Sequence, residues 1–309
     1  MFNRPLTALL LCLTLPFSAH GSETEPPLQV VASFSILGDI VKQVGGEAVA
    51  VRVLVGADSD AHGYQPTSAD MKAVAAADLV IANGLGFDGW IQNLAKTAKF
   101  KGKLVTASKG VAPRTLLEAE SESDEHHGDH DHEGLLDPHA WQDLRNGQIY
   151  VENITQALTA ARPAATAITA RATAYKAELA ALDDSLRAQI AAIPAARRVV
   201  ITSHDAFGYF GAAYGIAFHA PQGLSTETEP SAASMARFLD QVKATGVKTV
   251  FIESMHNPRL IETLGRDTGA KVGGTLYSDA LSAPDGPAPS YQSMFKHNSA
   301  LLLAAMRGM

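Results

Sequence analysis

The chain has 309 residues, which is enough for two domains that each bury a core of their own. Hydrophobic residues make up 46% and aromatic residues 6% of it, a composition typical of a soluble α/β protein. The formal net charge of −7 gives no indication of nucleic-acid binding. Eight acidic residues and no Lys or Arg lie between positions 118 and 133, so the rest of the chain is close to neutral.

The first 21 residues read as a cleavable secretory signal that directs the protein to the periplasm. Arg4 supplies the positive charge, and residues 6–17 form an apolar stretch too short to span a bilayer. A small-x-small site, Ala19-His20-Gly21, ends the segment. Cys12 is the only cysteine, and the leucines before it do not suit a lipoprotein signal. The mature chain therefore has no thiol, and any metal site in it must use nitrogen and oxygen.

Apolar runs alternate with helical patterns through the first half of the mature chain. Four such strand-then-helix units predict a parallel sheet covered on both faces, and we assign residues 28–160 to an N-terminal lobe. The predicted strands are 28–33, 49–55, 79–83 and 104–106.

A long helical pattern at residues 163–193 follows this lobe. Apolar residues recur there at steps of three and four, with Pro163 suited to the first turn and Pro194 to the end. About 28 helical residues would span about 42 Å, so we expect a rigid helix that joins two lobes. The strand and helix pattern then resumes, and residues 196–309 are predicted to form a C-terminal α/β lobe.

A loop of about 29 residues, 108–136, interrupts the N-terminal lobe. Its core at 118–133 is rich in acids and contains four histidines, so we expect it to be mobile. The two interpretations, a weak zinc-capturing site and a solvated linker, carry about equal weight at this point. The histidines are His126, His127, His130 and His132.

Four metal-competent side chains follow predicted strands or lie in the adjoining loops, two in each half of the chain. Ligands of open α/β sheets bind beyond the carboxyl ends of the strands, and a cleft between two lobes would bring such residues together. Three imidazoles and one carboxylate make a zinc-like tetrahedral set. The four residues are His62, His139, His204 and Asp279.

Three further carboxylates are candidates to orient these imidazoles by accepting their far N–H groups. Asp137 and Asp205 are equally suited to capping local turns. Glu253 ends an apolar strand, where burial without a partner would be costly. We interpret the remaining histidines, His219, His256 and His297, as structural or surface residues.

Five motifs together resemble the metal-binding solute receptors of ABC transporters, the cluster of zinc and manganese periplasmic proteins, and most of all its AztC-type zinc receptors. The resemblance implies two α/β lobes joined by one long helix with a metal between them, and motif by motif it implies the ligands His62, His139, His204 and Asp279. The motifs are DAHGYQP (60–66), DPHAWQD (137–143), SHDAFGYFGAAYGI (203–216), GLSTETEPS (223–231) and LYSDALS (276–282).

The resemblance also implies a function, namely capture of Zn²⁺ and its delivery to a membrane permease and ATPase, with a zinc chaperone as a further partner. Manganese members of the family place a carboxylate where this chain has His204, and a set of three nitrogens and one oxygen favours zinc, with copper and nickel as competitors. We expect a monomer that is not an enzyme. A zinc buffer or metallochaperone without a permease is the main alternative. A manganese receptor and a zinc hydrolase rank lower, because four protein ligands leave no open position for water.

Overall fold

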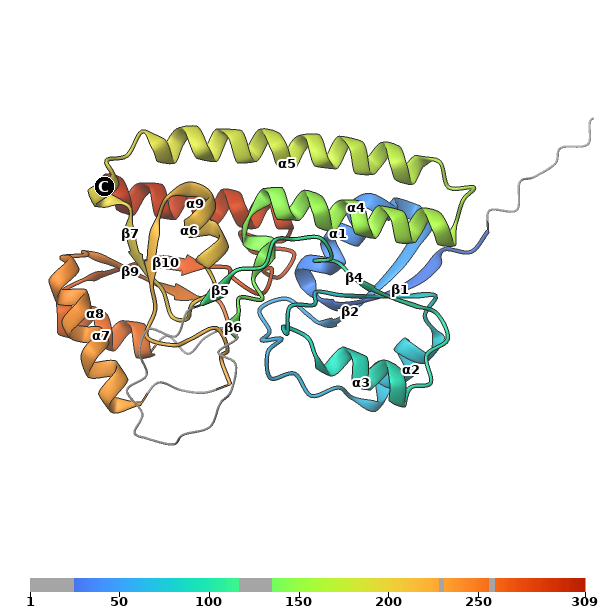
Figure 1. The fold of residues 1–309 in the computed structure, drawn as a ribbon, viewed down its shortest axis with the longest axis horizontal. Helices are drawn as coiled ribbons and strands as arrows, with labels where there is room; N and C mark the ends of the chain where they lie inside the picture. The colour runs from blue at the N-terminus through green and yellow to red at the C-terminus, as the bar shows by residue number, and fades with distance from the viewer. Residues whose placement is uncertain (1–24, 117–134, 228–230, 256–258, 309) are drawn as a thin grey trace, which may run out of the picture.

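The structure is a computed structural model that describes residues 25–116, 135–227, 231–255 and 259–308. Two α/β lobes lie side by side, and one long helix, α5 (Ala167–Ala191), runs across both of them (Figure 1). The predicted fold class is therefore confirmed. The signal segment and the acidic loop at 118–133, with its four histidines, lie outside the described residues.

The N-terminal lobe is built on four parallel strands in the order β2-β1-β3-β4. The central strand β1 is almost entirely buried, as expected for a parallel sheet covered on both faces. The Thr67 side chain and Asp70 form a capping box that starts α2. The elements are β1 (Leu28–Phe34), α1 (Ser35–Gly45), a 3-10 turn (Gly46–Ala48), β2 (Val49–Val55), α2 (Ser68–Ala76), β3 (Leu79–Ala82), α3 (Trp90–Thr97) and β4 (Lys103–Thr106).

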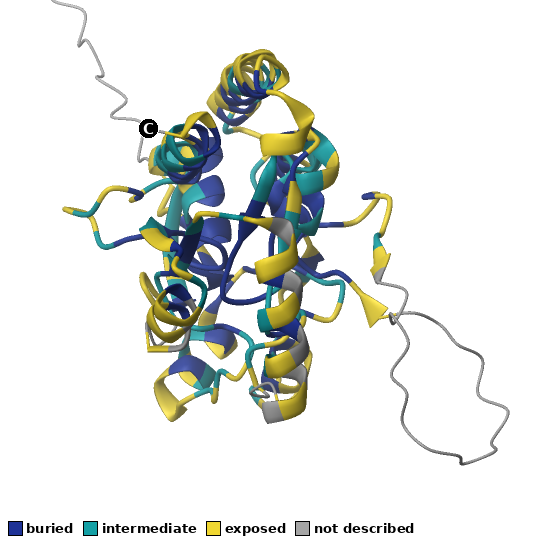
Figure 2. Cartoon of the chain, turned by 90° about the vertical axis from the view of Figure 1, so that its left-hand side faces the viewer, coloured by how far each residue is buried: buried dark blue, intermediate teal, exposed yellow. Residues whose placement is uncertain are grey.

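The C-terminal lobe repeats this architecture with strands in the order β10-β9-β7-β8, again all parallel. Figure 2 shows this lobe end-on, with buried residues inside and exposed ones on the outer faces of its helices. The elements are a 3-10 turn (Ala195–Arg197), β7 (Val199–Ile201), α6 (Gly208–Tyr214), β8 (Ala217–His219), α7 (Ala232–Thr245), β9 (Thr249–Glu253), α8 (Arg259–Thr268), β10 (Lys271–Leu276) and α9 (Tyr291–Arg307).

A helix that the sequence analysis did not predict, α4 (Leu144–Ala161), connects the N-terminal lobe to α5. Its apolar residues do have helical spacing, but Gly147 and Thr155 lower its intrinsic propensity and its stability comes from packing. A short antiparallel pair, β5 (Thr115–Leu116) and β6 (Leu135–Leu136), and a 3-10 turn (Ala140–Gln142) precede it.

The linking helix α5 is shorter than the predicted 163–193, with 25 residues or about 38 Å. Its buried residues recur at steps of three and four, from Ile168 to Ile190, and this stripe faces α1, α4, α6 and α9. Figure 1 shows α4 and α9 side by side beneath it, one from each lobe. The helix is therefore packed against both lobes along its length and acts as a rigid support.

One buried carboxylate on this helix joins the lobes. Asp183 accepts hydrogen bonds from Arg145 on α4 (3.2 Å), from Arg187 one turn further along α5 (2.8 Å) and from the Tyr214 hydroxyl on α6 (2.9 Å). Its side chain is 4% exposed, whereas Arg145 is 64% exposed. The Arg187 guanidinium also lies over the Tyr214 ring. A single side chain thus holds one element of each lobe to the linking helix.

Replacing this carboxylate should destabilise the protein. Asp183→Ala leaves the buried Tyr214 hydroxyl without its acceptor and removes both arginine contacts, so we expect the free energy of unfolding to fall by about 1–3 kcal/mol. Denaturant titration measures this quantity. The exposed neighbour offers a matched control, since Asp184→Ala should change stability by less than about 0.5 kcal/mol. Equal effects of the two substitutions would contradict the assigned role.

Candidate metal centre

His62 lies in the loop between β2 and α2, and a nearby carboxylate fixes its backbone. Asp60 Oδ1 accepts the His62 backbone N–H at 2.9 Å, while Asp60 Oδ2 accepts the Thr226 hydroxyl of the C-terminal lobe at 2.6 Å. The His62 side chain is 5% exposed. One acid thus positions His62 and ties its loop to the opposite lobe.

His139 follows the short strand β6 and precedes the 3-10 turn, so it does not end a strand of the main sheet as its position in the sequence indicated. Asp137 Oδ1 accepts both the His139 backbone N–H and the ring Nδ1–H, each at 2.9 Å. Asn83 Nδ2 donates to the Pro138 carbonyl between them (2.9 Å). Because Nδ1 faces Asp137, Nε2 is the ring nitrogen that points toward His62 and Asp279.

His204 follows β7, and its partner is the carboxylate at the end of the neighbouring strand β9. Glu253 Oε1 accepts the backbone N–H groups of Ser203 and His204, both at 2.9 Å. Glu253 Oε2 lies 2.7 Å from His204 Nδ1. Both side chains are fully buried. This buried glutamate therefore has the partners that its burial requires, and it holds Nε2 of His204 toward the cleft.

Asp279 follows β10, in a loop that the N-terminal lobe supports. Trp141 Nε1 and Gln142 Nε2 both donate to the Ser278 carbonyl, at 2.8 and 2.7 Å. On the other side of Asp279, the Leu281 N–H donates to the Ser35 hydroxyl at 2.9 Å. The carboxylate itself is fully buried. The C-terminal lobe thus contributes Asp279, while contacts from the N-terminal lobe fix its position.

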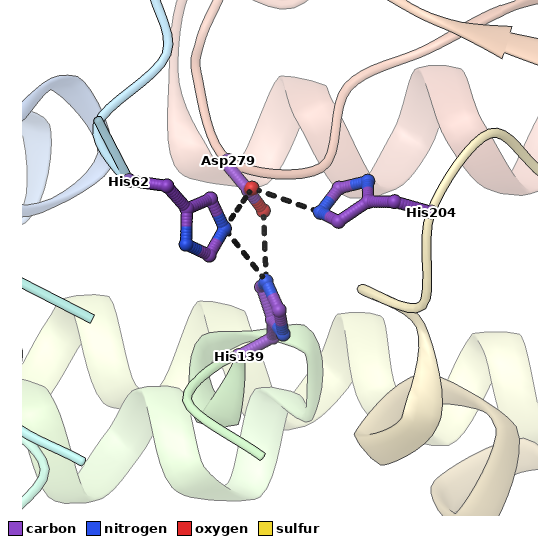
Figure 3. Close-up of side chains that lie close together, drawn as sticks. All are labelled: His62, His139, His204 and Asp279. Carbon is purple, nitrogen blue, oxygen red and sulfur yellow. Dashed lines mark hydrogen bonds and ion pairs between the residues drawn. The ribbon is translucent and has the colours of Figure 1, made fainter. Parts of the chain in front are cut away.

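The four side chains converge on one point between the lobes (Figure 3). Asp279 Oδ2 lies 3.1 Å from Nε2 of both His62 and His204, and Asp279 Oδ1 lies 3.6 Å from Nε2 of His139. The Nε2 atoms of His62 and His139 are 3.4 Å apart. One donor atom from each residue lies within 4.8 Å of all the others.

These separations fit a tetrahedral metal site. With ligand bonds of about 2.0–2.1 Å, neighbouring ligand atoms around zinc lie about 3.3 Å apart. The recorded contacts of 3.1–3.6 Å bracket that value. The three imidazole nitrogens and the Asp279 carboxylate are thus close enough together to be candidate ligands of one small divalent cation.

Neighbouring charges shift the pKa values of the buried groups in this cluster. Burial disfavours the charged imidazole of His139, but attraction by Asp279 and the hydrogen bond to Asp137 outweigh it and raise its pKa to about 9. For His204, attraction by Glu253 and Asp279 likewise overcomes burial and raises the pKa well above its ordinary value. Burial opposes ionisation of Asp279, yet the two imidazoles hold its pKa well below the usual range. A bound cation would replace these protons.

Aromatic rings enclose the site on the N-terminal side. The Phe87 ring lies edge-on to His62, with centroids 4.7 Å apart, and Trp141 packs against both His139 (5.3 Å) and Phe87 (4.7 Å). Phe34 closes the cluster behind them. Apolar walls keep water out and strengthen the electrostatic interactions of any ion held there.

Two of the three carboxylates that the sequence offered for orienting the imidazoles do contact one. Asp137 and Glu253 contact the rings of His139 and His204. The Asp205 carboxylate is instead half-buried near Asp137, and its pKa is raised first by burial and then by the charge of Asp137. Of the other histidines, His297 bonds to the Thr275 carbonyl (2.9 Å), and His219 is the last residue of β8. His256 is outside the described residues.

The sequence analysis missed Asp60, although a pattern in the sequence indicates it. Asp60 stands two residues before His62, and Asp137 stands two residues before His139. In both cases the aspartate accepts the backbone N–H of the histidine at 2.9 Å, which is an Asx turn. The repeated Asp-x-His spacing is therefore the signal that could have identified both acids. No comparable signal identifies Trp141 and Gln142, which act through a distant carbonyl.

Two α/β lobes, a helix that spans them and a buried cluster of nitrogen and oxygen ligands between them define a periplasmic metal receptor of an ABC transporter. The chain belongs to the family described as zinc-uptake complex component A, periplasmic, whose model matches residues 30–305. Members of this class are binding proteins rather than enzymes, and they work with a permease and an ATPase.

Individual relatives differ in the metal that their names give. The chain is 32% identical to the manganese-binding lipoprotein MntA of Halalkalibacterium halodurans, over 90% of this chain and 88% of the relative. It is 31% identical to the iron-binding protein YfeA of Yersinia pestis, over 89% of this chain and 85% of that relative. The solved structure of the periplasmic zinc-binding protein TroA from Treponema pallidum superimposes with a TM-score of 0.80 at 30% identity, covering 91% of this chain and 99% of that one. The comparisons show the family but do not assign the chain to the AztC-type zinc receptors in particular.

Metal affinity should depend on pH. Because the pKa of His139 is about 9 without metal, this imidazole is protonated at pH 7, and a metal ion must displace its proton. We expect metal affinity to rise between pH 6 and 8 by about tenfold per pH unit for each proton released. Above pH 9 His139 is already deprotonated, so its proton no longer contributes to the rise. Competition titrations measure the affinity, and calorimetry in buffers of different ionisation enthalpy counts the protons. A metal affinity that does not change with pH would contradict the assignment of a positive charge to His139.

The carboxylate behind His139 should tune metal affinity without contacting the ion. Asp137→Asn keeps an oxygen for the backbone N–H but removes the charge that makes His139 a strong ligand, so affinity should fall about 10–100-fold. Asp205→Asn is the matched control, because it removes the same charge from a nearby carboxylate that faces Asp137. It should change affinity far less. A comparable loss in both variants would show that only the overall charge matters.

Proposed function

We propose that this protein captures Zn²⁺ outside the cytoplasmic membrane through His62, His139, His204 and Asp279, and delivers it to an ABC permease for import. The observation that carries the proposal is the convergence of three Nε2 atoms and one carboxylate at separations of 3.1–3.6 Å. Soft or borderline cations prefer such nitrogen-rich sets, whereas Mn²⁺ prefers oxygen ligands and higher coordination.

Two features favour zinc over the manganese and iron named for MntA and YfeA. The set contains a single carboxylate, and each of Asp137 and Glu253 already engages the far nitrogen of an imidazole rather than facing the ion. Buried aromatic rings also leave little room for additional water ligands. A manganese receptor is the second candidate, and its support is the naming of relatives such as MntA.

The proposal includes the route and the partners. The N-terminal segment would be removed as a secretory signal without lipidation, in contrast to the relatives that are lipoproteins. A monomer would carry the ion to the permease and its ATPase, and a periplasmic zinc chaperone would serve as donor. Among the described helices, none combines the length and apolarity needed to cross a bilayer. Stimulation of the reconstituted transporter would distinguish this receptor from a zinc buffer.

Metal preference provides the direct test. Native mass spectrometry of the purified protein should show one zinc ion, and competition titrations should show zinc displacing manganese. His204→Glu replaces a nitrogen by a carboxylate next to Glu253 and should shift the preference toward manganese without inverting it, because the other ligands are unchanged.

His204→Gln provides the control, since it has similar size without the added charge and should weaken both metals together. Wild-type protein that holds manganese as tightly as zinc would contradict zinc as the cargo and leave the receptor class intact. Near-wild-type zinc affinity in His204→Gln would contradict the ligand set itself.

A further inference from the structure

A cavity lies next to the C-terminal end of α9. Figure 1 shows this end of α9 at the outer end of the C-terminal lobe. Its volume is about 850 Å³, within the range of small-molecule sites. It opens at the amino ends of β7, β9 and β10, whereas His204 and Asp279 follow the carboxyl ends of β7 and β10. The cavity is therefore on the opposite edge of the same sheet from the metal centre, and nothing in the metal-binding function uses it.

Five basic residues surround this cavity, and no acid is among the residues that line it. All five side chains are exposed, and in the described part of the chain the structure records no ion pair for any of them. The acids nearest in sequence, Asp240 and Asp267, lie outside the lining. For a chain of net charge −7 this is a marked local excess of positive charge. The basic residues are Arg197, Lys243, Lys248, Lys271 and Arg307.

Helix ends account for part of this charge but not for all of it. The C-termini of α7, α8 and α9 meet at the cavity, and each carries about half a negative charge. Lys243 and Arg307 lie in the last turns of α7 and α9, where they offset the helix dipoles. Arg197, Lys248 and Lys271 remain as a surplus. Five positive charges against about one and a half negative ones leave the cavity strongly positive.

Two of the surplus lysines are held next to each other. The Lys271 backbone N–H donates to the Lys248 carbonyl at 2.8 Å, which places both residues at the entry of neighbouring strands. The strand register pairs Lys271 with Thr249, so the two lysines are offset by one position at the same end of the sheet. Both ammonium groups are exposed at the rim of the cavity, where a bound anion could contact them.

The floor of the cavity is apolar. Val200, Val242 and Phe251 are buried beneath the basic rim, and Met306 closes one side. The three helices end at Gly246, Gly269 and Gly308, each with positive φ, and added side chains there would meet open space. The cavity is larger than a lone phosphate ion requires, so it has room for an organic group attached to the phosphate.

We propose that this pocket binds a phosphate-bearing ligand with an organic portion. A tetrahedral phosphate accepts hydrogen bonds from several directions, as the guanidinium of Arg197 and the ammonium groups of Lys248 and Lys271 offer, and the volume of the cavity leaves room for the remainder of the ligand. The same chemistry occurs in a soluble organic phosphate and in a phospholipid headgroup. The pocket operates independently of the metal centre.

The experiment uses the mature protein at low ionic strength, with glycerol 3-phosphate and pyrophosphate as soluble probes and vesicles of phosphatidylglycerol or phosphatidylcholine as membrane probes. Calorimetry measures binding of the soluble probes, and co-sedimentation measures binding of the vesicles. We expect the protein to bind at least one soluble probe, or to bind phosphatidylglycerol vesicles but not phosphatidylcholine vesicles. Soluble binding without vesicle binding identifies a free phosphate as the ligand. Vesicle binding that pyrophosphate reverses identifies the headgroup.

Charge reversal at the rim is the decisive comparison. Lys248→Glu should weaken binding of the probe at least tenfold, whereas Lys296→Glu, an equal charge change on the exposed face of α9 away from the pocket, should leave it unchanged. Zinc titration of each variant checks the fold. If Lys248→Glu does not bind zinc, Lys271→Gln replaces it. Absence of binding by the wild type to every probe, or equal binding by the Lys248 and Lys296 variants, would overturn the proposal.

Discussion

The structure depends on the burial of one carboxylate, Asp279, among three imidazoles that come from both lobes. A buried charge is tolerated only when it is paired and hydrogen-bonded, and Asp279 finds its partners in His62, His139 and His204. No lobe could bury this group alone, because two of its partners belong to the N-terminal lobe. The cleft between the lobes is thus stabilised by the same interactions that prepare it for a cation.

Each histidine of this cluster is held in place by a carboxylate outside the cluster. Asp60, Asp137 and Glu253 fix the backbone of a histidine, and the last two also engage the far ring nitrogen. Such partners set which nitrogen is free to bind and how basic it is. Asp60 also bonds to Thr226 across the cleft, so the orientation of His62 is coupled to the relative position of the lobes.

The linking helix limits how far the lobes can separate. It packs on helices of both lobes, and Asp183 joins α4 and α6 to it through hydrogen bonds. A hinge would need a few residues free to change φ and ψ, whereas α5 is continuous over its 25 residues. Metal capture and release are therefore expected to involve the loops that carry His62 and the segment around Thr226 more than a large rotation of whole lobes.

The sequence by itself determined the alternation of strands and helices, the absence of a thiolate ligand and the side-chain types of the site, because these follow from local periodicity and from composition. It also indicated Glu253, since an acid at the end of an apolar strand needs a partner. Helix α4, the distinction between Asp137 and Asp205, and the carbonyl contacts of Trp141 and Gln142 with Ser278 were decided only by the tertiary structure. The Ser278 contacts join residues more than 130 positions apart, and the burial and orientation of each group depend on how the two lobes pack rather than on the residues beside it in the chain.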